Sequence, residues 1–278
     1  MSSCLLNNHY SVLMSVYQRE NAEHLCAAMN SIWEQTVGTD DFVLVCDGPL
    51  TPALDAVIEK METANGGALR VVRLETNSGL GKALNTGIRY CRNELVARMD
   101  SDDISCPDRC ENQLRIFREH PEVSIVSGTV EEFTTCTADA VSRRQLPEKQ
   151  EEILAFAKKR NPFNHPCVMY KKSAVEAAGG YQDFYLLEDY YLWVRMLQKG
   201  FAGYNIPQTL LWMRAGSDMY RRRGGWEYAK SQERLFRYMR DSGFIGKTQY
   251  VENAIVRTIA SLIPNRVRSI TYRHLLRK

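Results

Sequence analysis

The sequence of 278 residues predicts an α/β fold with a Rossmann-like, mostly parallel sheet, flanking helices and a helical C-terminal extension. Up to residue 100, strand patterns alternate with helix patterns, each about one crossover long, which favours parallel strands covered by helices. The segment 42–46, FVLVC, is apolar throughout, as expected of a strand buried on both faces. Beyond residue 223 the pattern is mostly helical.

Each element of the N-terminal half has its own signal. Residues 10–16 alternate and are rich in Val, which predicts a strand, and apolar residues recur at helical spacing within 20–36. The strand 42–46 stops at Asp47-Gly48-Pro49, a strong turn signal. The same patterns predict helices at 52–64 and 80–92 and strands at 70–74 and 94–99.

The C-terminal half is less regular. Pro107 suits the first turn of a helix over 107–119, and a strand at 123–128 precedes an irregular stretch over 129–147. The remaining expected elements are a short helix at 149–159, a strand at 165–170 and helices at 188–199, 225–241 and 249–263. We expect one domain over 1–213, with halves 1–103 and 104–213, followed by a basic, amphipathic helical region over 214–278.

The net charge of +3 conceals a split along the chain. Residues 214–278 hold 15 basic and 5 acidic residues, a net charge of +10, so residues 1–213 carry −7. The near balance argues against a nucleic-acid partner. Basic residues interleaved with aromatic and aliphatic ones suit an anionic membrane surface, although a solvated helical face packed on the body would have the same composition.

Targeting and redox features favour a cytoplasmic location. No run of about 18 apolar residues predicts a membrane-spanning helix, and residues 1–8 lack the features of a signal peptide. The eight cysteines are scattered and form no CxxC pair, so we expect reduced, mostly buried thiols rather than disulfides or a zinc site.

Polar signals follow four of the predicted strands, at the edge where open parallel sheets bind ligands. They are the segments 15–20, 47–49, 77–82 and 100–103. Any one of them could be a solvated turn, because Asp and Gly favour turns for conformational reasons. Four at one edge predict a binding site.

The segment Asp100-Ser101-Asp102-Asp103 places three carboxylates directly after an apolar strand. Like charges at this density need a cation or hydrogen-bond donors, and hard oxygen ligands select Mg²⁺ or Mn²⁺. The alternative is an acidic helix start before Pro107, stabilised by the helix dipole.

The glycine segment 79–84 matches neither common phosphate motif. Leu84 replaces the last glycine of G-x-G-x-x-G, and Ala83 follows Lys82 where a phosphate loop has Ser or Thr. Neither a nicotinamide cofactor nor ATP hydrolysis is therefore favoured. A glycine turn that opens a helix can still approach a phosphate, with Lys82 adding positive charge unless it is only a solvated helix residue.

Five segments in order resemble glycosyltransferase family 2, which has the GT-A fold. They are the opening strand 11–17, Asp47, the pattern Asn77-x-Gly79-x-x-x-Ala83-x-Asn85-x-Gly87, the DxD motif Asp100-Ser101-Asp102, and Leu187-Glu188-Asp189-Tyr190-Tyr191-Leu192-Trp193. The resemblance covers residues 10 to about 213 and is nearest to transferases that assemble bacterial surface polysaccharides. Ser15 departs from the proline common in the family.

The resemblance implies a nucleotide-sugar site that requires Mn²⁺ or Mg²⁺. Asp102 is the expected metal ligand, with Asp100 and His165 as further candidates, although a lone histidine is more often a core or surface residue. The donor is expected to be a UDP-sugar, with galactose or glucose as the sugar. The expected nucleotide-sugar-binding residues are Val16, Tyr17, Glu20, Asp47, Asn77, Gly79, Lys82, Asp100 and Ser101.

By the same resemblance, Asp189 is the general base of an inverting transfer and Glu188 contacts the acceptor or donor sugar, although the two roles could be exchanged. Both acids could also merely cap their helix. The expected acceptor is a glycan on a polyprenyl diphosphate, in assembly of O-antigen, capsule or exopolysaccharide. Arg221, Arg222 and Arg223 could bind its diphosphate, and the enzyme could lie peripherally on the inner face of the cytoplasmic membrane.

Two other functions compete with this interpretation. A sugar-phosphate nucleotidyltransferase shares the sheet and the acidic metal site, but it has a glycine-rich basic loop after the first strand, where this chain reads Val16-Tyr17-Gln18-Arg19-Glu20. A non-catalytic sugar-nucleotide-binding protein is disfavoured by the intact DxD motif and acidic pair.

Overall fold

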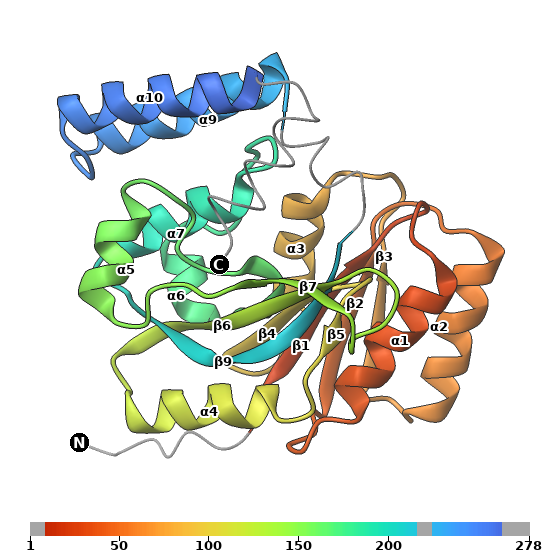
Figure 1. The fold of residues 1–278 in the computed structure, drawn as a ribbon. Helices are drawn as coiled ribbons and strands as arrows, with labels where there is room; N and C mark the ends of the chain where they lie inside the picture. The colour runs from red at the N-terminus through yellow and green to blue at the C-terminus, as the bar shows by residue number, and fades with distance from the viewer. Residues whose placement is uncertain (1–8, 216–223, 263–278) are drawn as a thin grey trace.

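The computed structural model describes residues 9–215 and 224–262, and its centre is one sheet in the order β3-β2-β1-β4-β8-β6-β9-β5, with β7 paired to β6 (Figure 1). The first four strands pair in parallel, as the sequence predicts. They are β1 (Ser11–Val16), β2 (Asp41–Cys46), β3 (Leu69–Arg73) and β4 (Leu95–Asp100).

The second half of the sheet is mixed rather than parallel. β8 (Met169–Lys171) pairs antiparallel with both β4 and β6 (Val123–Phe133), whereas β6 pairs in parallel with β9 (Ala202–Arg214). The short strands β5 (Ile104–Ser105) and β7 (Ala140–Arg144) pair antiparallel with β9 and β6. The expected α/β, Rossmann-like fold is confirmed, and its continuous parallel part is β3-β2-β1-β4 in the N-terminal half.

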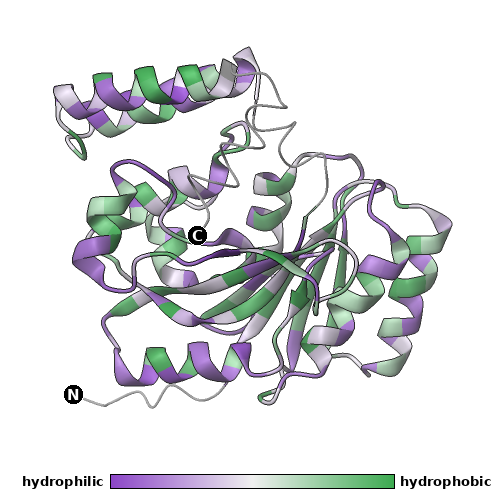
Figure 2. Ribbon diagram, viewed as in Figure 1, coloured by the Kyte–Doolittle hydropathy of each residue, from purple (hydrophilic) through white to green (hydrophobic). Residues whose placement is uncertain are grey.

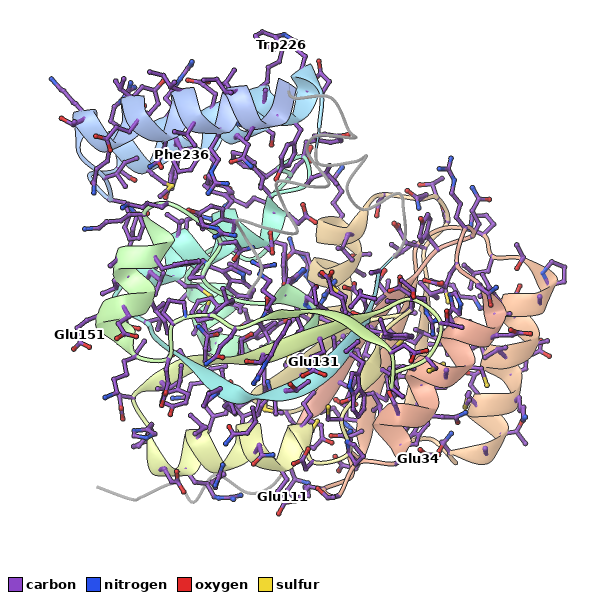
Figure 3. The ribbon with its side chains drawn as sticks, viewed as in Figure 1. Glu34, Glu111, Glu131, Glu151, Trp226 and Phe236 are labelled. Atoms are coloured by element: carbon purple, nitrogen blue, oxygen red, sulfur yellow. The ribbon has the colours of Figure 1, made fainter. Side chains whose placement is uncertain are left out.

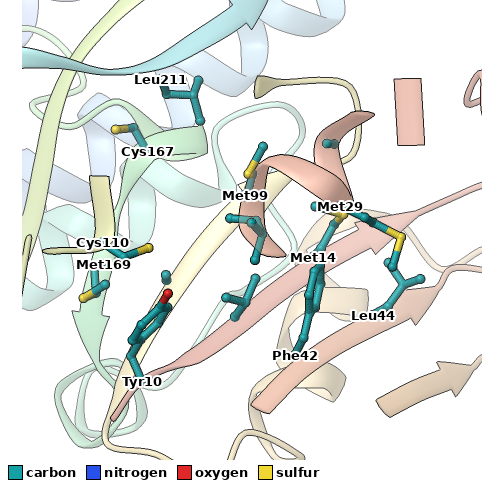
Figure 4. Packing of buried hydrophobic residues seen from close by; sticks show 14 of the residues in the cluster. Tyr10, Met14, Met29, Phe42, Leu44, Met99, Cys110, Cys167, Met169 and Leu211 are labelled. Carbon is teal, nitrogen blue, oxygen red and sulfur yellow. The ribbon is translucent and has the colours of Figure 1, made fainter. Parts of the chain in front are cut away.

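Helices cover both faces of the sheet because its strands are apolar on both faces. In β1, Val12 and Met14 point into one core and Leu13 into the other. Figure 4 shows part of the first core, and Figure 2 shows hydrophobic stretches along the central strands. The first core is covered by α1 (Ala22–Trp33), α2 (Pro52–Ala64) and α4 (Arg109–Glu119). The second is covered by α3 (Leu80–Ile88), α5 (Gln150–Ala157), α6 (Lys172–Ala177) and α7 (Glu188–Gln198).

Close packing explains why position 87 of the pattern is a glycine. At Gly87, α3 lies unusually close to the sheet. A Cβ atom added at Gly87 would lie 2.4 Å from Leu13 Cδ1 and 2.6 Å from Val45 Cγ2. A larger residue would push α3 away from β1 and β2, and the turn that precedes α3 would move with it.

Two expectations for the C-terminal half were wrong, and one strand was not predicted. The stretch 129–147 is not irregular, because β6 continues to Phe133 and β7 follows; buried polar residues such as Thr129, whose Oγ1 donates to Pro207 O at 2.9 Å, obscure the apolar pattern. Residues 165–167 form the 3₁₀ helix η1 (His165–Cys167), since Pro166 has no N–H for a sheet ladder. The sequence also did not predict β9, where Pro207 sits at a shift of the β6–β9 register.

The helices expected near 225–241 and 249–263 are confirmed as α9 (Trp226–Asp241) and α10 (Lys247–Leu262), which form a hairpin beside α7 (Figure 1). Phe236 points from α9 toward the body, where a third apolar cluster joins α9 to α7, whereas Trp226 points away (Figure 3). The boundary expected after residue 213 falls one residue before the end of β9.

Two absences hold for the described part of the chain. Within residues 9–215 and 224–262, no helix combines the length and the apolar character needed to cross a bilayer. The cysteines in the same ranges are all free thiols, five of them buried.

Candidate active site

A pocket of about 730 Å³ lies at the carboxyl edge of β1, β2 and β4 and extends to the start of α7 and to α9 and α10. Its volume is in the usual range for a small-molecule site. The pocket brings together most of the residues singled out in the sequence. They are Tyr17, Glu20, Asp47, Asn77, Gly79, Asp100, Ser101, Asp102, His165, Glu188 and Asp189.

Some of the expected site residues lie elsewhere. Val16 is buried in the first core, and its carbonyl oxygen accepts a hydrogen bond from the Asp47 backbone N–H at 2.8 Å. Lys82 is exposed on α3 and is not part of the pocket wall. Arg221, Arg222 and Arg223 lie outside the described residues.

Asp47 organises the loop that precedes α3. Its Oδ1 accepts hydrogen bonds from the Ser78 backbone N–H at 2.7 Å and the Ser78 hydroxyl at 3.0 Å, and its Oδ2 accepts the Gly79 N–H at 3.0 Å. Asn77 Nδ2 donates to the Asp47 carbonyl oxygen at 3.1 Å. The aspartate after β2 therefore fixes the shape of the loop 77–79 along the pocket wall.

Asn85, another residue of the glycine-rich pattern, connects this half of the site to the other. Its side chain accepts a hydrogen bond from the Tyr181 N–H at 2.8 Å and donates one to the Tyr181 carbonyl oxygen. Tyr181 begins the segment that leads to α7. The pattern thus holds the acidic start of α7 in place relative to the loop 77–79.

Arg98 is a pocket residue that the sequence analysis missed. It is fully buried, and its two terminal nitrogens donate to the two carboxylate oxygens of Asp100, with the Nη1–Oδ2 distance at 3.0 Å. A bidentate pair of this kind fixes a carboxylate in orientation. Strand alternation was the available signal, because residues two apart on β4 share a face and Arg98 is a charge within an apolar strand.

Asp102 is a carboxylate in a largely buried, acidic environment. Burial, together with the charges of the nearby Asp100 and Glu20 carboxylates, raises its pKa from the ordinary 3.8 to about 7. Glu20 is held in place by the Ser101 hydroxyl, which donates to its Oε2 at 2.6 Å. A cation would relieve this repulsion and favour the ionised form.

Asp103 performs a different task from its two neighbours. It is buried, its Oδ1 accepts the backbone N–H of Arg214 at 2.8 Å, and its Oδ2 has no hydrogen-bond partner among the described residues. Burial, followed by the charges of Asp102 and Asp100, raises its pKa well above the ordinary value. Asp103 joins the acidic loop to the end of β9, and it does not start α4, which begins at Arg109.

The donor atoms at the acidic loop suit a hard divalent cation. Asp102 presents a carboxylate to the pocket, whereas the Asp100 carboxylate is engaged by Arg98. Within the part of the chain that the structure describes, no group of three or more His, Cys, Asp or Glu side chains is arranged to hold a metal. A cation at Asp102 would therefore take its other ligands from a bound phosphate and water, as Mg²⁺ commonly does.

The acidic pair Glu188 and Asp189, at the start of α7, also lines the pocket. Asn161 Nδ2 donates to Asp189 Oδ2 at 2.6 Å, and the Tyr190 N–H donates to Asp189 Oδ1 at 2.6 Å. Glu188 is largely buried, and this burial, together with the charge of Asp189, raises its pKa to about 7. The preceding Leu186 has a positive φ of 57°, an uncommon backbone conformation for this residue type that turns the chain into the helix.

His165 lies at the pocket floor in an aromatic setting. Its Nε2 is 2.9 Å from the Tyr181 hydroxyl, and its ring contacts Trp193 edge-on. Burial, with the Arg98 charge as a second cause, lowers its pKa well below the ordinary value. His165 is therefore neutral, and its Nε2 is already engaged by Tyr181.

Three arginines that line the pocket form the second feature that the sequence analysis missed. They are Arg144 of β7, Arg160 after α5, and Arg257 of α10. Arg257 Nη2 donates to the Lys159 carbonyl oxygen at 2.6 Å, which places it beside Arg160. Arg160 and Arg257 both lie close enough to Tyr190, the neighbour of Asp189, to affect its pKa. This wall is suited to an anionic group near the acidic pair.

The raised pKa of Glu188 has a consequence for stability. Its folded-state pKa of about 7 exceeds the ordinary 4.5, so the folded protein keeps a proton that the unfolded chain releases. Stability from this group is present below pH 4.5 and is lost as the pH rises toward 7. Relative to wild type, we expect Glu188→Gln to gain on the order of 1–3 kcal/mol of unfolding free energy between pH 4.5 and 8. Urea unfolding with a chelator present measures the difference, and a constant gap across that range would contradict the assignment.

Comparison with protein families identifies the domain that contains this pocket. The model of "Glycosyl transferase family 2" matches residues 11–179, more than half of the chain. The match includes β1, the loop 77–79 and the acidic loop after β4.

Curated relatives match over nearly their whole length. The amylovoran biosynthesis glycosyltransferase AmsE of Erwinia amylovora is 41% identical over 95% of this chain and 97% of its own. The UDP-Gal:alpha-D-GlcNAc-diphosphoundecaprenol beta-1,3-galactosyltransferase of Escherichia coli is 36% identical over 97% of each chain.

Solved structures share the fold at low sequence identity. The mannosyltransferase PcManGT from Pyrobaculum calidifontis, in complex with GDP-Man and Mn²⁺, has a TM-score of 0.64 at 16% identity and covers 94% of this chain and 72% of its own. S. aureus TarS 1–349 in complex with UDP has a TM-score of 0.59 at 18% identity, over 96% and 85%. The expected GT-A fold is confirmed, and the chain belongs to glycosyltransferase family 2 and is a glycosyltransferase.

Proposed function

We propose that this glycosyltransferase moves a hexose from a UDP-sugar to a glycan carried on a lipid diphosphate, with inversion, in assembly of an exopolysaccharide or O-antigen. The observation that carries the proposal is one pocket that is lined both by the acidic loop after β4 and by the acidic pair of α7. Two relatives support the choice of pathway and substrates, since their names describe amylovoran biosynthesis and UDP-galactose transfer to a diphosphoundecaprenol-linked sugar.

The donor occupies the end of the pocket formed by β1, β2 and β4. Tyr17, which is 39% exposed, offers its ring to the base, and Asp47 shapes the loop 77–79 beside it. Arg98 holds Asp100 toward the nucleoside, and Glu20 is held by Ser101. Asp102 would hold Mn²⁺ or Mg²⁺, which when bound stabilises negative charge on the diphosphate. The neighbour that contains GDP-Man and Mn²⁺ supports a divalent cation in this fold.

Transfer needs a base on the acceptor side. We assign this role to Asp189, because Asn161 and the Tyr190 N–H fix both of its oxygens. The acceptor hydroxyl oxygen bonds to the anomeric carbon as the bond from that carbon to the diphosphate oxygen breaks. The hydroxyl proton passes to Asp189, and the nucleoside diphosphate leaves with the electron pair. Attack opposite the leaving group inverts the anomeric centre, and Glu188 contacts a sugar.

The arginine wall holds the acceptor's diphosphate. Arg160 and Arg257 lie beside the acidic pair, on elements separate from those that contact the donor. Guanidinium groups bind phosphate oxygens in a bidentate manner, which suits a fixed diphosphate. Arg221, Arg222 and Arg223 stay candidates for the same contact.

We expect Arg257→Gln to raise the KM for a lipid-diphosphate acceptor about tenfold and to leave the KM for the donor within twofold, because a charged hydrogen bond contributes about 1.5–3 kcal/mol. Initial rates with one substrate varied at a time measure both constants. Arg237→Gln, on the exposed face of α9 where the arginine pairs with Glu233, is the matched control. Equal increases in both KM values would contradict an acceptor-side role.

One assay tests the proposed reaction. Purified protein is incubated with Mn²⁺ or Mg²⁺, a panel of nucleotide sugars and a synthetic lipid-diphosphate-GlcNAc acceptor, and the product mass identifies the sugar that was transferred. Coupling constants of the anomeric proton establish the stereochemistry. A product that retains the donor's anomeric configuration, or a full rate in the presence of a chelator, would refute the corresponding part of the proposal.

A lipid-linked acceptor requires the enzyme to work at a membrane surface. We therefore propose that the protein lies peripherally on the cytoplasmic face of the membrane. The net charge of +10 over 214–278 supports this location, because anionic lipids attract basic segments.

A further inference from the structure

The exposed outer face of α10 carries four aliphatic side chains, with one acid, Glu252, among them. Val251, Ile255, Val256 and Ile259 are 51%, 55%, 62% and 58% exposed. Their spacing places them on one stripe of the helix. Four aliphatic side chains gathered on one exposed stripe are typical of a contact surface rather than of scattered surface residues.

The opposite face of α10 is anchored to the body. Asn253 Nδ2 donates to the Lys158 carbonyl oxygen at 2.9 Å, and Arg257 Nη2 donates to that of Lys159 at 2.6 Å. The carbonyl oxygen of Ser261, which is buried, accepts the Gly225 N–H at 2.9 Å. The apolar stripe therefore faces outward while the other face is hydrogen bonded to the rest of the molecule.

The same helix forms part of the pocket wall. Arg257 lines the pocket, two residues from Ile255 and Ile259 on the other side of α10. Since helix diameter with side chains is about 10–12 Å, whatever contacts the stripe lies about that far from Arg257. Figure 1 shows the α9–α10 hairpin at the end of the molecule opposite α4.

Charge distinguishes among the surfaces that could cover the stripe. In the sequence, residues 263–278, directly after α10, contain five basic residues and no acidic residue. An apolar stripe followed in the sequence by a segment of this charge matches a lipid surface with anionic headgroups, which offers both hydrocarbon and negative charge. A second copy of this chain would bring a segment of the same positive charge to the contact.

We propose that Val251, Ile255, Val256 and Ile259 insert into an anionic membrane surface. This docking presents the arginine wall of the pocket to the diphosphate of an acceptor held in the same membrane. The proposal rests on the proposed acceptor class for its purpose, but lipid binding itself does not depend on it. Insertion of aliphatic side chains gives affinity, and the basic residues direct the protein to anionic lipid.

The test is cosedimentation of the full-length protein with vesicles of phosphatidylglycerol and phosphatidylethanolamine, compared with phosphatidylcholine vesicles. We expect binding to the anionic vesicles, and we expect Ile255→Asp/Ile259→Asp to lower the partition coefficient at least about tenfold. Val141→Asp, at an aliphatic residue of β7 that is 59% exposed, is the matched control and should bind as wild type does. Thermal unfolding of each variant checks that it folds.

Transfer rates measured with two kinds of acceptor test this proposal separately from the proposed function. With a short, water-soluble diphosphate acceptor the Ile255→Asp/Ile259→Asp variant should retain the wild-type rate, and with acceptor embedded in vesicles it should lose most of it. Wild-type vesicle binding by this variant would overturn the proposal. A wild-type dimer that dissociates in this variant, without binding to vesicles, would overturn it in favour of a second copy. Vesicle binding without any transfer would refute only the proposed function.

Discussion

Replacing Asp102 by asparagine should lower kcat/KM for sugar transfer by about a hundred- to a thousandfold, because the charge that would hold a divalent cation beside the diphosphate is lost. The effect on stability should have the opposite sign. Burial and the Asp100 and Glu20 charges already disfavour the Asp102 carboxylate, so a neutral residue relieves repulsion in the metal-free protein. We therefore expect the metal-free Asp102→Asn variant to unfold at the same temperature as wild type or higher.

The measurements are initial rates against Mn²⁺ concentration and thermal unfolding with and without Mn²⁺ and UDP. Wild type should be stabilised by the two ligands together, and Asp102→Asn should not. Asp55→Asn is the control, because Asp55 forms a partly exposed ion pair with Arg73 and lies outside the pocket. Full activity of Asp102→Asn, or loss of activity together with unfolding, would remove the support for a metal role.

Asp189→Asn should lower kcat by about a hundred- to ten-thousandfold while the KM for the donor changes little, since a positioned general base contributes about that much. Asparagine keeps one of the two oxygens, which can still accept the Tyr190 N–H at the start of α7, whereas its NH2 group cannot accept the Asn161 hydrogen bond. Thermal unfolding of the variant at the wild-type temperature would show that the start of α7 keeps its geometry. The loss would then report the missing proton acceptor rather than a displaced helix.

Glu188→Gln provides the comparison that assigns the two acids. Glu188 has a pKa of about 7 and could itself accept a proton, so the roles of the pair are distinguished by which variant loses kcat. A larger loss of kcat in Glu188→Gln than in Asp189→Asn would exchange the roles. Hydrolysis of the donor without acceptor should be measured for both variants, since it reports the donor side alone.

Local chemistry made the grouping of Asp47, Asp100 and Asp102 predictable from the sequence. Asp100 and Asp102 lie at the end of the apolar strand β4, and Asp47 directly follows β2, so the topology of parallel strands brings them to one edge. The same argument could have included Arg98, which shares a face of β4 with Asp100. What the spacing did not show was that Asp47 binds backbone N–H groups of its neighbouring loop.

The proposed acceptor site is formed by contacts between segments that are far apart in the sequence. Such contacts leave no signal in the local sequence pattern. Arg160 and Arg257 become neighbours because α10 packs against the end of α5, and the hydrogen bond from Arg257 spans 98 residues. β9 escaped prediction because Pro207 and polar neighbours interrupt its apolar pattern, and its role is visible only through its pairing with β6. Without β9, Arg214 looked like the first residue of a basic tail, whereas its backbone N–H binds Asp103.

The Asp103–Arg214 hydrogen bond has a consequence for recombination between family members. The proposed donor site is made by residues up to Asp103, and the proposed acceptor site comes from segments after residue 140, so on this proposal acceptor preference can diverge while the nucleotide site is inherited intact. The two parts are not freely exchangeable modules, however. A chimera joined between residues 213 and 214 must keep the end of β9 in register with the acidic loop and must not have proline at position 214, because the backbone N–H of that residue has to reach Asp103 Oδ1.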